Sequence, residues 1–343
     1  MNAVQNVAKT IIIDECKELI HVINIIPKNS AAMLSLGLIP YIALVVNESL
    51  KWCENCKVVI PKLSDEQNYI IKRLRVKCKF YTGDNKYSLI EQRKRLEEVV
   101  MIEKHYFENQ SWLAKQLYKY GIIKDAGTYL WDGIYIGNTI LYSDYFEPFR
   151  NIQKSIYESS HEIYNFSVTI GKTLQSIIAI LDGNLYECKN EHIHLKEPKS
   201  KDYFLNNCFF YSGDIDKMML FNILCSINFI INYLSNLLTN ASTLLFRIKY
   251  LTLYHVTEDL KQLDFTEIAD NVLFKRDFRN VMAHYGLFKV LSKNKIIDSA
   301  KMFGLIESNF DMSFQDMVDL MDDNLRMIQY NLEKFFELDN LDN

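Results

Sequence analysis

Hydrophobic residues recur every three or four positions through most of this 343-residue chain, which is the spacing of amphipathic helices. Typical helix boundaries support that interpretation: Ser64-Asp65-Glu66 resembles a helix start, and Asp182-Gly183 a helix end. The pattern predicts helices over about residues 1–28, 31–57, 64–80, 86–120, 148–182, 215–237, 240–262, 265–285 and 313–338. We therefore expect an all-α fold.

The composition favours the same class. Only 11 glycines and 5 prolines are present, too few for the regular turns that a β-sandwich or barrel requires. Neither G-x-G-x-x-G nor G-x-x-x-x-G-K occurs, so the phosphate loops of Rossmann and P-loop enzymes are not indicated. With 49% hydrophobic residues, the chain has ample material for a core.

A change in composition suggests two parts. Residues 121–148 are rich in glycine and aromatic residues, and Pro148 then opens a predicted helix. We interpret 1–145 as an N-terminal helical region of unknown role and 146–343 as a second helical domain. Within it, the polar residues 184–212 are expected to form an insertion loop, and the stretch before residue 313 has some short-strand character.

Charge and cysteine content favour a cytoplasmic protein with no membrane partner. The net charge of −4 means that any nucleic-acid contact must be local. Seven scattered cysteines, an odd number, and no signal-peptide pattern in the first residues predict free thiols in a reducing compartment. The longest apolar stretch, Ala31 to Val46, is shorter than a membrane span and is expected to be a core helix.

Two features leave alternatives open. Cys53-x-x-Cys56 is compatible with half of a zinc site completed by distant residues, although packed thiols fit its helical context better. The distant candidates are Cys188, His192 and His194. A basic run could contact a nucleic-acid backbone, but a solvated helix face is the favoured interpretation. That run consists of Lys72, Arg73, Arg75, Lys77 and Lys79. We expect no metal and no cofactor.

The most informative stretch is the helix predicted over 265–285. Asp264-x-x-Glu267 resembles a helix cap and Gly286 a helix stop. One stripe is apolar, formed by Phe274, Phe278, Val281 and Tyr285. Its neighbour becomes polar toward the C-terminal end, with Leu273, Asp277, Asn280 and His284. Arg276 and Arg279 flank that second stripe. A polar cluster beside a core stripe indicates a functional role for these side chains in addition to contact with solvent.

Arg279-Asn280-Val281-Met282-Ala283-His284 resembles the signature of the HEPN superfamily, an Arg and a polar residue followed at short spacing by a His. HEPN domains are helical and occur in prokaryotic toxins and defence ribonucleases. The resemblance covers residues 146–343 and implies a HEPN-type helical bundle there. It departs from toxins that are modified on a Tyr two residues after the His, because Gly286 occupies that position.

The resemblance implies a metal-independent endoribonuclease of the toxin or anti-phage defence type, which leaves 2′,3′-cyclic phosphate and 5′-OH ends. His284 would act as acid or base, Arg279 would stabilise the phosphate, and Asn280 would orient the histidine. Lys275, Arg276 and Tyr285 are the expected RNA contacts around them. Because one chain has a single motif histidine, a homodimer is expected. An antitoxin or a trigger protein would be a further partner.

Two other functions remain open. The same bundle could be a non-catalytic module for dimerisation or for binding nucleotide or RNA. Alternatively, the motif match is accidental and His284 only pairs with carbonyl groups at the helix end of a scaffold unrelated to HEPN. Residues 275–295 hold six basic residues against Asp277, whereas residues 307–342 hold ten acidic residues against two basic ones. Pairing of that acidic helix with the basic one would favour the non-catalytic module.

Overall fold

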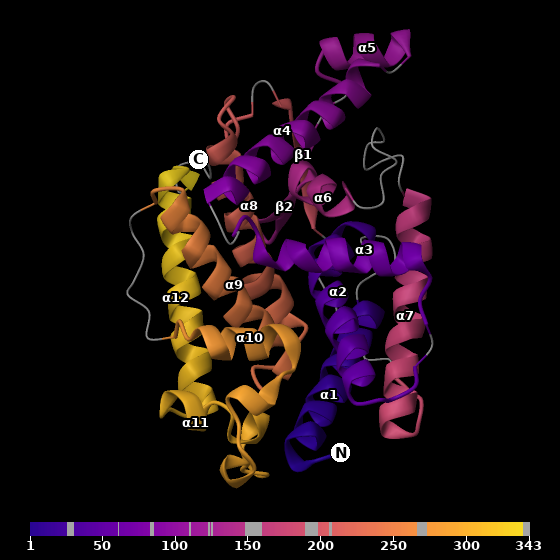
Figure 1. The fold of residues 1–343 in the computed structure, drawn as a ribbon. Coiled ribbons are helices and arrows are strands. Elements are labelled where there is room, and N and C mark those ends of the chain that lie inside the picture. The colour runs from indigo at the N-terminus through magenta and orange to yellow at the C-terminus, as the bar shows by residue number, and fades with distance from the viewer. Residues whose placement is uncertain are drawn as a thin grey trace.

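The computed structural model describes residues 1–25, 31–60, 62–82, 86–109, 111–122, 124, 126–147, 160–188, 198–205, 208–265 and 273–338. In these ranges the chain forms twelve α-helices and one three-stranded sheet (Figure 1). The mainly helical class is confirmed, while the small sheet departs from the all-α expectation.

The N-terminal helices largely follow the predicted boundaries. They are α1 (Ala3–Ile25), α2 (Ala31–Asn55), α3 (Asp65–Val76), α4 (Lys86–Glu108) and α5 (Trp112–Lys119). Ser64 and Gln67 form a capping box that starts α3 where the sequence predicts it. The single helix expected over 86–120 is wrong, because the Ser111 side chain accepts the Ala114 N–H and starts α5 separately.

A small antiparallel sheet lies in the stretch where the composition changes. Its strands are β1 (Ala126–Trp131), β2 (Ile134–Asn138) and β3 (Lys199–Tyr203), in the order β2-β1-β3. Asp132 and Gly133 both have positive φ and form the tight turn between β1 and β2. Residues 199–203 therefore form a strand inside the expected insertion loop, since they pair with β1 along its length.

The C-terminal elements surround the motif. They are α6 (Thr139–Phe146), α7 (Ser160–Asp182), α8 (Ile215–Asn228), α9 (Thr243–Gln262), α10 (Arg276–His284), α11 (Glu307–Phe310) and α12 (Phe314–Phe335). Gly183 follows α7 with φ of +86°, as its predicted helix end requires. The described part of 286–312 forms short 3₁₀ turns and α11, not strands. The beginning of the helix predicted over 148–182 lies outside the described residues.

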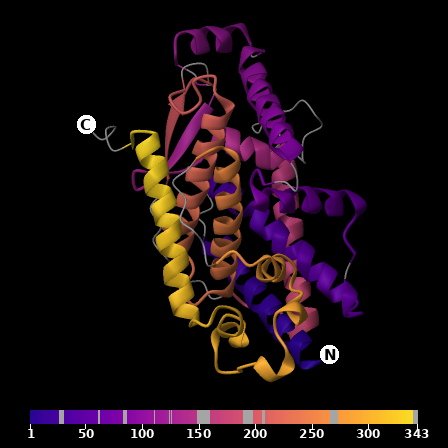
Figure 2. The same ribbon diagram turned by 60° about the vertical axis from the view of Figure 1, so that its left-hand side comes forward.

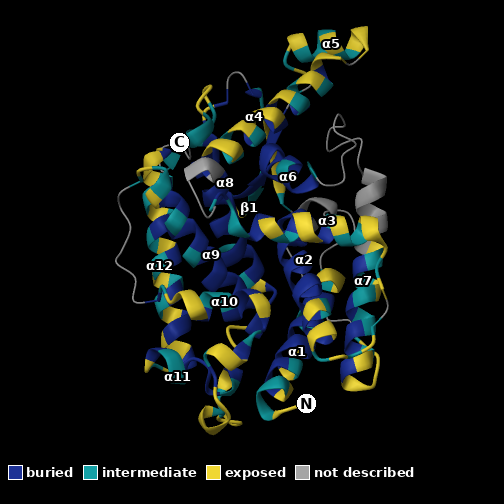
Figure 3. Ribbon diagram, in the orientation of Figure 1, coloured by how far each residue is buried: buried dark blue, intermediate teal, exposed yellow. Residues whose placement is uncertain are grey.

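Helices from the two ends of the chain pack together. α9 contacts α1, α10 and α12, while α2 contacts α7 and α10 (Figures 1 and 2). Buried side chains concentrate in α2, α8 and α9, and one hydrophobic cluster extends from Val7 to Phe336 (Figure 3). Residues on both sides of position 145 share this core, and the division into 1–145 and 146–343 remains a prediction from the sequence.

One helical stretch in the described residues, Ile215–Asn236, is long and apolar enough to cross a membrane. However, 89% of its most apolar window is buried inside the protein, as in the core helix of a soluble protein. The apolar stretch up to Val46 belongs to α2, and its side chains from Leu36 onward are buried. This agrees with the core helix expected there.

Candidate functional site

The motif helix α10 is shorter than predicted. Residues 273–275 are not helical, and Lys275 is the N-cap of a nine-residue helix that ends at His284. Asp264 adopts a left-handed conformation directly after the end of α9, so it terminates that helix rather than starting the next. Glu267, the other half of the predicted cap, lies outside the described residues. The helix predicted over 265–285 is therefore wrong at residues 265 and 273–275, and its residues 266–272 lie outside the described residues.

The C-terminal half of α10 keeps the predicted faces. Phe278 and Val281 are buried, and His284 is exposed on the neighbouring side. The helix ends one residue before the expected stop, because Tyr285 itself takes the left-handed position with φ of +52°. Tyr285 and His284, adjacent in the chain, therefore point into different environments.

His284 lies against the N-terminal helices. Its Nδ1 is 2.8 Å from Oε2 of Glu48 on α2. Nη2 of Arg75 on α3 lies 3.3 Å from Nδ1 and 3.5 Å from Nε2. The histidine side chain is 47% exposed, whereas the Glu48 side chain is only 2% exposed. The site thus has a buried carboxylate and a histidine that reaches the surface.

Glu48 is ionised near neutral pH. Burial by itself raises the pKa of its carboxyl, but the His284 hydrogen bond and the Arg75 charge outweigh burial and lower the pKa to about 2. An ionised carboxylate can only accept hydrogen bonds. We therefore assign the Nδ1 hydrogen of His284 to the bond with Glu48, which makes Nε2 the proton-accepting nitrogen of the neutral ring.

Arg279 is not joined to His284. In the described part of the chain no hydrogen bond links the two side chains, and the Arg279 guanidinium instead lies 5.1 Å from the Tyr254 ring centre on α9. On an ideal helix the two residues are separated by about 140°, which accounts for the divergence. Nε of Arg279 is enclosed without a hydrogen-bond partner. Arg75 is the cation that lies beside His284.

A second histidine, His255 on α9, lies near these cations. Burial lowers its pKa to about 3, with further lowering from the charges of Arg279, Lys79 and Arg75. His255 is therefore neutral and enclosed. The charges of Arg279, Lys79 and Arg75 thus act on the region between α3, α9 and α10.

The other predicted site residues differ in how far they are exposed. Asn280 is half-buried and Arg276 is exposed. The Lys275 ammonium donates to the Asn309 carbonyl and lies 4.6 Å from the Phe310 ring centre. Lys275 and Arg276 thus remain near the surface of α10.

Tyr285 is instead part of the core. It is 3% exposed, its hydroxyl donates to Glu15 of α1, and the Arg247 guanidinium lies 4.1 Å from its ring centre. Arg247 also pairs with Glu15 at 2.5 Å and donates to the carbonyls of Met282 and Ala283. In this structure Tyr285 has no surface for an RNA contact, because this network encloses it.

The basic run 72–79 is only partly a solvated face. Lys77 is buried and bonds to Asp144, and Arg73 pairs with Glu147. Arg75 is 13% exposed and turned toward Glu48. Lys72 remains exposed. Internal ion pairs therefore account for several of these charges.

The cysteines are free thiols in this structure, including Cys53 and Cys56. Among the described residues, no group of three His, Cys, Asp or Glu side chains is placed to hold a metal ion. Cys188 lies 4.0 Å from Nδ1 of His21. His192 and His194 lie outside the described residues, and the zinc alternative that includes them remains a prediction.

The acidic helix α12 packs on α9. Its Asp322 pairs with Lys249 at 2.7 Å. Within the residues that the structure describes, no ion pair connects α12 to the basic residues of α10. The contact that would favour a non-catalytic module is thus not seen here.

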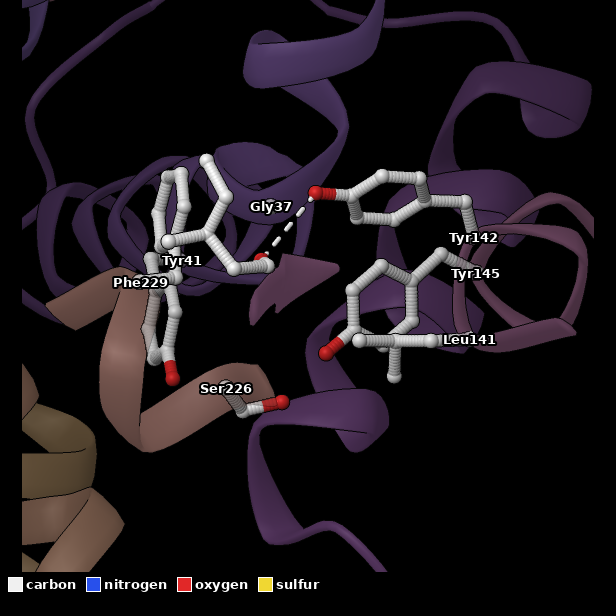
Figure 4. A pocket seen from close by; sticks show the side chains of 8 residues that line it. Gly37, Tyr41, Leu141, Tyr142, Tyr145, Ser226 and Phe229 are labelled. Atoms are coloured by element: carbon white, nitrogen blue, oxygen red, sulfur yellow. Dashed lines mark hydrogen bonds between the residues drawn. The ribbon is translucent and has the colours of Figure 1, made fainter. Parts of the chain in front are cut away.

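A small pocket lies elsewhere, between α2, α6 and α8 (Figure 4). Three tyrosines and Ser226 line it, and the Tyr142 hydroxyl donates to the Ile136 carbonyl. Gly137 is required nearby, because a Cβ there would lie 2.1 Å from that hydroxyl. The cavity of about 10 Å³ has room for about one water and is too small for a nucleotide.

Comparisons with protein-family models, with curated proteins and with solved structures found no match to this chain. The site is therefore defined by its own geometry: Glu48, Arg75 and His284, with further cations nearby. Sequence analysis found His284 but missed Glu48. A single glutamate in an apolar helix is a weak signal, although burial of such a residue requires a charged or hydrogen-bonding partner.

Proposed function

We propose that this protein is a metal-independent endoribonuclease of the toxin or anti-phage defence type with a HEPN-like domain. The observation that carries the proposal is the half-exposed His284 held by a buried, ionised Glu48 and flanked by Arg75. A histidine with a fixed carboxylate partner suits proton transfer near neutral pH. The Arg279-Asn280-x₃-His284 spacing supports the same family.

In the proposed reaction, Nε2 of His284 accepts the proton of a ribose 2′-hydroxyl, and that oxygen attacks the adjacent phosphorus. The bond from phosphorus to the 5′-oxygen breaks, and a second acid returns a proton to the leaving oxygen. The products are a 2′,3′-cyclic phosphate and a 5′-OH. Arg75, which lies beside the imidazole, would stabilise the negative charge that develops on the phosphate, and Arg279 would join it by leaving Tyr254.

We propose that a second copy of the chain supplies the acid, so that the active form is a homodimer. RNA is the proposed substrate, with an antitoxin or a trigger protein as a further partner. Lys275 and Arg276 support RNA as the substrate. They lie at the start of α10, where their positive charges would contact the phosphate backbone of an RNA that follows the helix.

Cleavage of end-labelled RNA in EDTA tests the proposal. The parent protein is compared with His284→Ala and with His105→Ala, a matched change at an exposed histidine on α4. We expect the parent and His105→Ala to cleave, and His284→Ala to lose about 10²- to 10⁴-fold in rate. Circular dichroism checks that His284→Ala folds, as its half-exposed position predicts.

Equal cleavage by His284→Ala and the parent would contradict the proposed site.

The second candidate function is a non-catalytic HEPN-like module for dimerisation or for binding nucleotide or RNA. The separation of Arg279 from His284 favours it, because the two motif side chains do not meet in one chain. RNA binding without cleavage by any of the three proteins would support this second function.

A further inference from the structure

The two oxygens of Glu48 have different partners. Oε1 accepts from Nε of Arg75 at 2.5 Å and from Nδ2 of Asn47 at 2.6 Å. Oε2 faces Nδ1 of His284 at 2.8 Å. Arg75 can only donate, and Asn47 faces Oε1 with its amide nitrogen, so the orientation of the carboxylate is fixed from the side opposite the histidine.

We infer that Glu48 is a positioning residue that fixes the tautomer and ring orientation of His284, leaving Nε2 to exchange protons with an RNA ligand. This inference rests on the proposed function for the identity of that ligand. The Nδ1–H···carboxylate contact itself rests on geometry: the Glu48 acceptor lies closer to Nδ1, at 2.8 Å, than the Arg75 Nη2 donor, at 3.3 Å, and that donor can face the Nε2 lone pair at 3.5 Å instead. If both atoms were unprotonated, two lone pairs would face each other at 2.8 Å, which is repulsive.

The inference also gives part of the N-terminal region a role. Glu48 and Arg75 both precede residue 146, whereas His284 lies in the part that resembles HEPN. The N-terminal helices therefore complete the site within one chain, in addition to any contact with a trigger or an antitoxin. Arg75 acts through Glu48 as well as directly, because its Nε holds Oε1 while its Nη2 lies beside the imidazole.

Glu48→Gln is a sharp test, because it changes hydrogen-bonding chemistry at nearly constant shape. Arg75 requires an acceptor at the Oε1 position, to which the Asn47 amide nitrogen also donates, so the Gln oxygen is expected there. The Gln NH₂ then occupies the Oε2 position and donates to Nδ1 of His284. The histidine hydrogen must move to Nε2, which blocks the proton-accepting nitrogen.

The readout is the ¹⁵N spectrum of protein labelled on histidine, recorded where the imidazole is neutral and assigned by the signal lost in His284→Ala. We expect the Nδ1–H tautomer in the parent and the Nε2–H tautomer in Glu48→Gln. Glu54→Gln, at an exposed position of the same helix, is the control and should keep the parent spectrum. A parent protein with the Nε2–H tautomer would overturn the inference, whether or not the variant folds.

RNA cleavage adds a second readout. A wrong tautomer at a carboxylate-held histidine is expected to reduce the rate by about 10²- to 10⁴-fold, with Glu54→Gln unchanged. If no protein cleaves RNA while the tautomer changes as expected, the positioning role stands and the ribonuclease proposal fails. If cleavage depends on His284 but the tautomer is the same in Glu48→Gln and the parent, the positioning role is wrong.

Discussion

Two neighbouring residues at the end of α10 are held by similar sets of side chains but lie in opposite surroundings. Tyr285 is held by Glu15 of α1 and Arg247 of α9, and all three are buried. His284 is held by Glu48 of α2 and Arg75 of α3, but its ring reaches the surface. Each set has one carboxylate, one guanidinium and one ring.

The difference between the two sets separates stability from chemistry. The Glu15–Arg247–Tyr285 set has no access to a ligand, so its charges serve only to hold α1, α9 and the end of α10 together. The Glu48–Arg75–His284 set is anchored in the same way but leaves one imidazole edge to solvent. Substitutions in the first set should therefore affect folding alone, whereas those in the second should also affect proton transfer.

The largest expected effect is that of Arg247→Ala. The substitution leaves Glu15 as a buried unpaired charge and removes the donors to the Met282 and Ala283 carbonyls. We expect a loss of about 3–5 kcal/mol in the free energy of unfolding, measured by chemical denaturation. Lys17→Ala, which breaks an exposed pair with Asp182, should cause a much smaller change. A loss below about 1 kcal/mol for Arg247→Ala would contradict the claim that the buried Glu15–Arg247–Tyr285 set stabilises the fold.

A somewhat smaller effect concerns the pH dependence of stability. The folded pKa of Glu48, about 2, lies below its ordinary value of 4.5. Its contribution is therefore fully present above pH 4.5 and is lost as the pH falls toward about 2. The parent should lose on the order of 3 kcal/mol more than Glu48→Gln across that window. Denaturation curves at several pH values measure this, and parallel profiles for the two proteins would disprove it.

Tyr285→Phe should have the smallest effect of the three. It removes one hydroxyl that donates to a buried carboxylate, while the ring stays against Arg247. The expected loss in unfolding free energy is about 1.5–3 kcal/mol, with RNA cleavage unchanged. Tyr330→Phe, at an exposed position of α12, provides the control and should leave stability unaltered. Loss of cleavage in folded Tyr285→Phe would show that the two sets are coupled.

Local signals predicted most helices. The Ser64 capping box and Gly183 operate through contacts or backbone angles within a few residues, so the sequence alone locates them. The break between α4 and α5 was missed because helical spacing continues across it, although Ser111 is a helix cap. The β1–β2 hairpin was also missed, yet Asp132-Gly133 between two short runs of aromatic and β-branched residues is a recognisable turn signal.

The site was only half predictable for a physical reason. His284 is part of a local motif, whereas Glu48 lies 236 positions earlier in the chain and Arg75 lies 209 positions earlier. No helical period connects residues so far apart, and their meeting depends on how α2, α3 and α10 pack. The same applies to Tyr285, whose aromatic character suits both a core and an RNA contact until Glu15 and Arg247 enclose it.

The origin of the two carboxylates has a consequence for how such a gene can recombine. Glu15 and Glu48 come from the first two helices, while the side chains that they hold come from α9, α10 and the residue after α10. An exchange that joins residues 146–343 to foreign N-terminal helices would leave Arg247 without its buried counter-charge and His284 without its acceptor. The N-terminal helices and the motif helix are therefore expected to be inherited as one unit.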